Sequence, residues 1–147
     1  MSKQVIITIT VDTDTLVKEF PKGGDITDHS VIVMTQEGGY FSYKTAFKDK
    51  LVTETAAGDA IKWKITSKNA NDALKLVAYK GDKSMLDIFK SQPAKDAADD
   101  KEFNGNVKDS LPQVTLTTTY TFDFCLKKQP DIVWSWDPDI IAQYPPR

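Results

Sequence analysis

The sequence has one cysteine and one histidine among 147 residues, and it has no apolar run long enough to cross a membrane, which takes ~18 residues. The single Cys125 excludes an internal disulfide and fits a reducing compartment. One cysteine and one histidine cannot supply a zinc site, which draws mainly on several such ligands. The opening stretch, MSKQVIITITVDTD, lacks the apolar core of a signal peptide. We therefore expect a cytoplasmic protein with no zinc centre and no membrane partner.

The sequence also lacks a large excess of either charge, because the formal net charge is only -2 and the pI is near 5.4. No basic stripe emerges, which argues against a nucleic-acid partner. No glycine-rich phosphate loop is present either, since Gly23-Gly24 and Gly38-Gly39 lack the Lys-Ser/Thr pair and the following helix. A hydrophobic content of 40% with 10% aromatics predicts a folded domain.

The longest patterned stretch is residues 114–126, VTLTTTYTFDFCL. Apolar side chains alternate with threonines along it, which predicts a long strand with one buried face. A second alternating stretch ends at Trp136, and we expect the two to form an antiparallel hairpin. We expect four aromatic rings to lie in the core, and burying them is worth on the order of 15–25 kcal/mol before the costs of folding are subtracted. These expected core rings are Trp63, Phe122, Phe124 and Trp134.

Several shorter stretches also alternate and predict strands. They are residues 4–11, 30–35, 40–45, 51–55, 60–66 and 73–80. The Gln-Glu-Gly-Gly turn at 36–39 predicts a hairpin around it. A helical turn is expected after residue 12, capped by Thr13 or Asp14, and another over residues 84–90. Seven or eight short strands with one or two helical turns predict an all-β fold, an antiparallel β-sandwich, with a closed barrel as the alternative.

Residues 91–110, SQPAKDAADDKEFNGNVKDS, show no strand or helix pattern. The segment is rich in acids, and structureless loops of this length are uncommon in compact domains. We expect a single domain over residues 1–147, with 91–110 as a long and partly mobile surface loop.

Three stretches in chain order resemble the bacterial PixA/AidA inclusion body protein family: IITITVDTDTLVKEFP, GDAIKWKITSKN and FDFCLKKQPDIVWSWDPDI. The resemblance spans nearly the whole chain. It implies a small all-β bacterial protein without an enzymatic mechanism, under quorum or stress control and associated with intracellular inclusions. Between residues 81 and 113 the chain has the acidic KDAADDKEF where the family has an aromatic segment, so no ligand loop is transferred from relatives.

Two acidic pairs adjoin the predicted strand ends, and an aromatic residue precedes the second pair. Calcium prefers several oxygen ligands on one small loop, so these acidic pairs are candidate ligands. No EF-hand pattern is present. The alternative is that the acidic pairs cap turns. An exposed ring can stack on a sugar while carboxylates hold its hydroxyls. The candidate ligand-binding residues are therefore Asp12, Asp14, Trp136, Asp137 and Asp139, with calcium as a candidate ion and a glycan as a candidate partner.

No catalytic residue and no cofactor is predicted. His29 lies in a loop with Asp25 and Asp28 but without a nucleophile signature, and Cys125 has no activating surroundings. The first hypothesis is a non-enzymatic protein of the PixA/AidA type that self-associates as a homo-oligomer or acts as an accessory binder, because uncovered strand edges can pair with copies. The alternative is a small lectin-like carbohydrate-binding module assisted by calcium.

Overall fold

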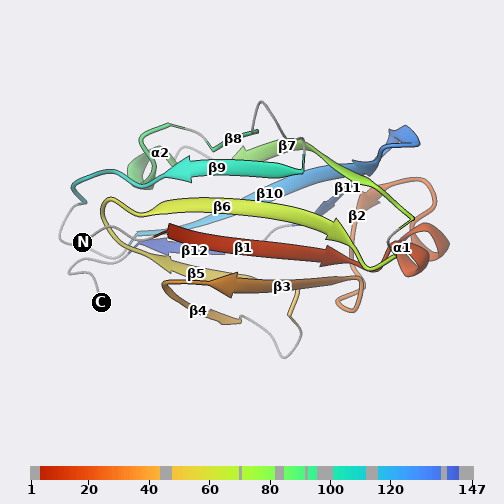
Figure 1. Cartoon of the computed structure of the whole chain (residues 1–147), viewed down its shortest axis with the longest axis horizontal. Helices are drawn as coiled ribbons and strands as arrows, with labels where there is room; N and C mark the ends of the chain where they lie inside the picture. The colour runs from red at the N-terminus through yellow and green to blue at the C-terminus, as the bar shows by residue number, and fades with distance from the viewer. Residues whose placement is uncertain are drawn as a thin grey trace.

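The computed structural model describes residues 4–43, 48–69, 71–81, 85–91, 93–95, 101–111, 116–136 and 139–142. This part of the chain is mostly β-strand, and two short helices interrupt it (Figure 1). The strands form two sheets that share one hydrophobic core. The prediction of a β-rich chain with one or two helical turns is therefore confirmed.

The first sheet has five strands in the order β3-β1-β6-β9-β8. They are β1 (Gln4–Val11), β3 (Ile32–Glu37), β6 (Ala60–Ser67), β8 (Ala94–Lys95) and β9 (Glu102–Asn106). β1 and β6 run parallel side by side, whereas β3 is antiparallel to β1. Val5, Ile7, Ile9 and Val11 are fully buried on one face of β1, as the alternation of branched residues predicts.

The second sheet has seven strands and is built on the long strand β10 (Leu116–Leu126). The others are β2 (Gly24–Asp25), β4 (Tyr40–Tyr43), β5 (Leu51–Thr55), β7 (Leu74–Gly81), β11 (Gln129–Trp136) and β12 (Asp139–Ala142). β7 and β11 both pair with the second half of β10, so they lie on its two sides, and β12 pairs with the first half. β11 is antiparallel to β10, which confirms the predicted C-terminal hairpin.

The helices are α1 (Thr13–Glu19) and α2 (Met85–Ile88). The prediction that Thr13 or Asp14 caps the first helix is wrong, because Asp12 is the N-cap and its side chain accepts a hydrogen bond from the Thr15 amide. The second helix falls within the predicted range of residues 84–90. In the described ranges, neither helix has the length and apolar character that crossing a bilayer requires.

Aromatic rings join the two sheets at the centre of the core. Trp63 of β6 is fully buried, and its indole Nε1 donates a hydrogen bond of 3.0 Å to the Tyr120 hydroxyl of β10. The ring of Trp63 also lies 5.7 Å from that of Phe122 and 6.2 Å from that of Phe89. The contact with Phe122 is edge-to-face, and such contacts add to the burial of the rings themselves. The four rings predicted for the core, Trp63, Phe122, Phe124 and Trp134, are all buried.

Three details of the predicted architecture are wrong. The pairing is not purely antiparallel, because β1 with β6, β2 with β11 and β5 with β12 are parallel. The described residues contain twelve strands, more than the seven or eight expected. β3 and β4 flank the predicted glycine turn but belong to different sheets. Alternation reports which face of a strand is buried, and it carries no information on the direction or identity of the neighbour.

The segment 91–110 was expected to be a loop without regular structure. In the structure β8 and β9 lie within it, and Phe103 of β9 is buried and pairs with Trp63 of β6. β9 has only five residues, with a glycine among them, so its sequence carries a weak strand signal. Residues 96–100, which hold most of the acidic cluster, lie outside the described residues.

We predict that Tyr120→Phe destabilises the protein by about 1–3 kcal/mol, because it removes the acceptor of a buried indole hydrogen bond while keeping the ring. Urea unfolding followed by tryptophan fluorescence measures the change. Tyr40→Phe is the matched control, since Tyr40 is 47% exposed, and we expect it to alter stability by less than about 0.5 kcal/mol. Equal stability of the Tyr120→Phe variant and the wild type would contradict this account of the core.

Candidate functional site

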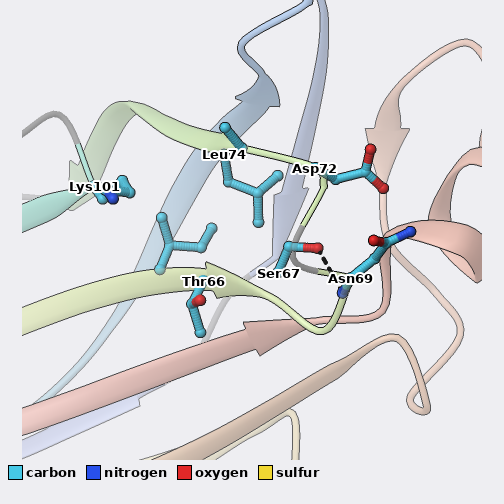
Figure 2. A pocket seen from close by; sticks show the side chains of 8 residues that line it. Thr66, Ser67, Asn69, Asp72, Leu74 and Lys101 are labelled. Atoms are coloured by element: carbon cyan, nitrogen blue, oxygen red, sulfur yellow. Dashed lines mark hydrogen bonds between the residues drawn. The ribbon is translucent and has the colours of Figure 1, made fainter.

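Three segments that are far apart in the sequence meet at one end of the two sheets: α1, the turn after β6 and the turn after β10. A hollow of about 460 Å³ lies between them, and we call it the Asp72 hollow. It is lined by Thr13, Asp14, Val17, Asn69, Asp72, Leu126, Lys128 and Gln129. A smaller hollow of about 180 Å³ shares Asn69 and Asp72 with it (Figure 2). The volume of the larger hollow is in the range of small-molecule sites.

The turn after β6 owes its shape to short polar side chains. The Asn69 amide donates to the Ser67 hydroxyl at 3.0 Å, and the Asn71 amide donates to the Asn69 side-chain oxygen at 3.0 Å. The Asp72 amide closes the turn onto the Asn69 carbonyl at 3.0 Å. Asn, Asp and Ser favour such local hydrogen bonds. Figure 2 shows the side chains of Ser67, Asn69 and Asp72 grouped at the end of β6.

Asp72 is held from two sides. The hydroxyl of the fully buried Thr13 donates to its Oδ2 at 2.7 Å, and Lys128 Nζ lies 3.2 Å from its Oδ1. The same Thr13 hydroxyl is 3.0 Å from that of Ser67. The Thr13 hydrogen bond, and secondly the one from Lys128, lower the pKa of Asp72 below its ordinary value of 3.8. The carboxylate is therefore ionised at neutral pH and ties all three segments together.

The two residues of the first predicted acidic pair, Asp12 and Asp14, have different partners and different surroundings. Both carboxylate oxygens of Asp12 are used in capping, with the Thr15 amide at 3.3 Å and the Thr15 hydroxyl at 2.9 Å. Asp14 is exposed, lines the Asp72 hollow and accepts a hydrogen bond of 3.3 Å from Asn69 Nδ2. Of this pair, Asp14 lines the Asp72 hollow and Asp12 does not.

Of the second predicted group, the described Trp136 does not line the Asp72 hollow. Trp136 is 4% exposed and packs against Phe122 and Phe124 in the core, so its ring offers little surface to a ligand. Asp137 lies outside the described residues. The backbone of Asp139 begins β12, opposite Thr119 of β10 and Val52 of β5. A ligand-binding role for these three residues stays a prediction.

His29 is not simply a solvated loop residue. Its Nδ1 lies 2.8 Å from Oδ2 of Asp49, which is buried, while its own side chain is 43% exposed. Asp25 and Asp28, named from the sequence, are therefore not the carboxylates in this pair. Cys125 is 1% exposed in β10 and offers no accessible thiol.

The Asp72 hollow has the chemistry of a polar binding site. Asp14 supplies acceptor oxygens, the amides of Asn69 and Gln129 both donate and accept, and Lys128 supplies a charged donor. Across the described ranges, no group of three or more His, Cys, Asp or Glu side chains is arranged to hold a metal ion. The arrangement therefore suits a small polar molecule held directly by side chains, and calcium stays a prediction.

Sequence reasoning missed Asn69, Asp72, Lys128 and Gln129 as site residues. The stretch SKNAND was recognised as a turn, and its high density of Asn, Asp and Ser was the available signal. That signal does not reveal that Asp72 meets a threonine 59 positions away and a lysine 56 positions away.

We predict that the carboxyl of Asp72 titrates below 3.8 in the folded protein, and that Thr13→Ala moves this pKa upward because the main hydrogen bond is lost. Because the folded-state pKa is lowered, the stability that Asp72 contributes is present above 3.8 and is lost as the pH falls through the folded value. Carboxyl carbon chemical shifts followed by NMR over pH measure the midpoint. Thr13→Ser keeps the hydroxyl and is expected to keep the low midpoint, and an unchanged midpoint in Thr13→Ala would contradict the assignment.

Comparison with solved structures finds an inclusion body protein, PixA, from Burkholderia cenocepacia. The match has a TM-score of 0.67 and 14% sequence identity, and it covers 97% of this chain and 96% of that one. At this identity the likeness shows a shared fold alone. A cysteine protease inhibitor from Entamoeba histolytica also matches, with 14% identity over 97% of each chain, but its TM-score of 0.37 is too low to support an argument. Comparison with curated proteins finds no match.

The sequence model of a family described as a domain of unknown function, DUF8788, matches residues 3–131. This range begins just before β1 and ends within β11, so it includes the three segments that form the Asp72 hollow. The resemblance to PixA is thus supported at the level of the fold, and the match by sequence is to DUF8788. The chain belongs to the DUF8788 family of domains of unknown function.

Proposed function

We propose that this protein is a non-enzymatic β-sandwich of the PixA type that self-associates in the bacterial cytoplasm. The observation that carries the proposal is the fold likeness to an inclusion body protein over nearly the full length of both chains. An inclusion is an accumulation of many copies, which requires contacts between them. The small net charge of -2 supports the proposal, because repulsion between copies is weak. Production under quorum or stress control belongs to the same proposal.

We predict that the weight-average sedimentation coefficient rises with protein concentration between about 10 µM and about 1 mM, the range in which weak interfaces associate. Sedimentation velocity at five or more concentrations measures this. The control for charge effects repeats the measurement at a higher salt concentration and fixed protein concentration. Salt screens the electrostatic repulsion between copies that each carry a net negative charge. A single monomeric species over the whole range would remove the proposal.

A second candidate function is the binding of a small hydroxylated ligand, such as a carbohydrate, in the Asp72 hollow. The observation that favours it is the convergence there of acceptors and donors from three segments. Sugar hydroxyls both donate and accept hydrogen bonds, so a carboxylate beside amides and an ammonium group matches them. Of the residues expected from the sequence, this candidate site contains Asp14, and it adds Asn69 and Lys128.

We predict that Asp14→Asn combined with Asn69→Ala weakens such binding by about tenfold or more, since two of the ligand's hydrogen bonds change or disappear. A glycan array probed with wild type and variant, with and without a chelator, measures the loss. Asp109→Asn is the matched control, because Asp109 is exposed and lies outside both hollows. Signal lost in the chelator would favour a calcium-assisted site, and blank arrays under both conditions would exclude this second function.

A further inference from the structure

β4 (Tyr40–Tyr43) is a terminal strand of the second sheet, and in the described part of the chain it pairs with β5 alone. Its sequence is Tyr-Phe-Ser-Tyr, with three aromatic residues and no charge. Tyr40 is 47% exposed and Phe41 is 44% exposed. Figure 1 shows β4 at the lower margin of the molecule. An exposed aromatic strand at a sheet edge is a template for pairing with another strand.

The other terminal strands each carry a feature that hinders such pairing. On β3, the Met34 amide already donates to the Lys48 carbonyl at 2.7 Å. β2 and β8 are only two residues long, and β7 carries Lys75 and Lys80. Coverage, shortness and lysine are the devices by which proteins protect edges. β4 has no charge and no proline, and one of its backbone carbonyls, that of Tyr40, accepts a hydrogen bond of 3.1 Å from Gln36 Nε2. Among the terminal strands of the described part of the chain, β4 is the one of more than two residues without a charged side chain.

We infer that β4 is the surface through which two copies of this chain pair, in antiparallel orientation about a two-fold axis. This inference rests on the proposed self-association and names its surface. An antiparallel edge strand is complementary to its own copy, and two-fold symmetry makes the same patch serve both partners. The two seven-stranded sheets thereby join into one continuous sheet across the dimer.

Charge near the two ends of β4 favours this orientation. Exposed Glu37 precedes the Tyr40 end, and exposed Lys48 follows the Tyr43 end. In an antiparallel pair, the Tyr40 end of one copy meets the Tyr43 end of the other, so unlike charges approach. A parallel pair would place like charges together, which is unfavourable.

The aromatic face of β4 sets the register. Phe41 and Tyr43 lie on one face with their rings 5.8 Å apart in an edge-to-face arrangement. With the two-fold axis at Ser42, Phe41 lies opposite the partner's Tyr43, and four rings form one cluster. Cross-strand aromatic pairs stabilise a sheet, and Ser42 then faces its own copy. Four residues bury little surface, so the association is weak and depends on concentration.

Phe41→Lys tests the surface, because it places positive charges at the centre of the paired strands. We expect its dimer dissociation constant, from sedimentation equilibrium, to be about tenfold or more above that of the wild type. Val77→Lys is the matched control, since Val77 is 41% exposed on β7 of the same sheet, and it is expected to associate as the wild type does. Ser42→Lys, at an exposed position, is expected to repeat the loss even where Phe41→Lys lowers stability. Equal association in all variants overturns the inference while leaving the proposed self-association in place.

Cross-linking tests the register independently. Directly opposed residues of an antiparallel pair have Cα atoms about 4.5–5.5 Å apart, which is within the range that a disulfide spans. We expect Ser42→Cys to form a covalent dimer on mild oxidation, whereas Ser91→Cys, at an exposed position away from β4, does not. The native Cys125 is buried, so the wild type is the control in which no covalent dimer is expected. A wild type that is monomeric at every concentration removes both proposals, and equal cross-linking at positions 42 and 91 removes the β4 interface alone.

Discussion

The structure depends on the contact between aromatic rings on the inner faces of its two sheets. Trp63 of the first sheet is bonded to Tyr120 of the second and packs on Phe122. Neither sheet alone could keep these rings out of water, and burial of each is worth several kcal/mol, on the order of 4–6. The turn that follows β6 and the turn that follows β10, the two strands that carry these rings, both line the Asp72 hollow. The position of the Asp72 hollow is therefore a consequence of how the core is assembled.

Much of the fold follows from local patterns. The alternating residues of β1, β6 and β10 predict which side chains are buried, because a strand with one wet face has a period of two. The same patterns could not reveal that β1 runs parallel to β6, since a strand alternates in the same way beside either kind of neighbour. They also fail for Asp123, which lies on the polar face of β10 and is nevertheless buried. Its carboxylate accepts a hydrogen bond of 2.6 Å from Ser135 and lies 2.7 Å from Lys80 Nζ, so tertiary partners replace water.

The sequence indicates the local structure of each segment of the candidate site, but it does not indicate that the segments meet. Asp14 sits in a stretch that reads as a helix start, and Asn69 and Asp72 sit in one that reads as a turn. Nothing local indicates that they meet. Trp136 was a ligand candidate from the sequence because it lies at the end of a predicted strand, and β11 does end there. β12 then continues along the same neighbour, β10, so Trp136 lies within the sheet and its ring is in the core.

The two surfaces of interest lie on different parts of the molecule. The Asp72 hollow is at the ends of strands, beside α1, whereas β4 is a lateral edge of the second sheet (Figure 1). The described lining of the hollow includes no residue of β4 or β5, so a second copy bound at β4 leaves the hollow open. Coupling between the two surfaces would need an element that touches both and has two arrangements. The proposed self-association and the proposed ligand binding therefore concern separate sets of residues, and each can be tested without the other.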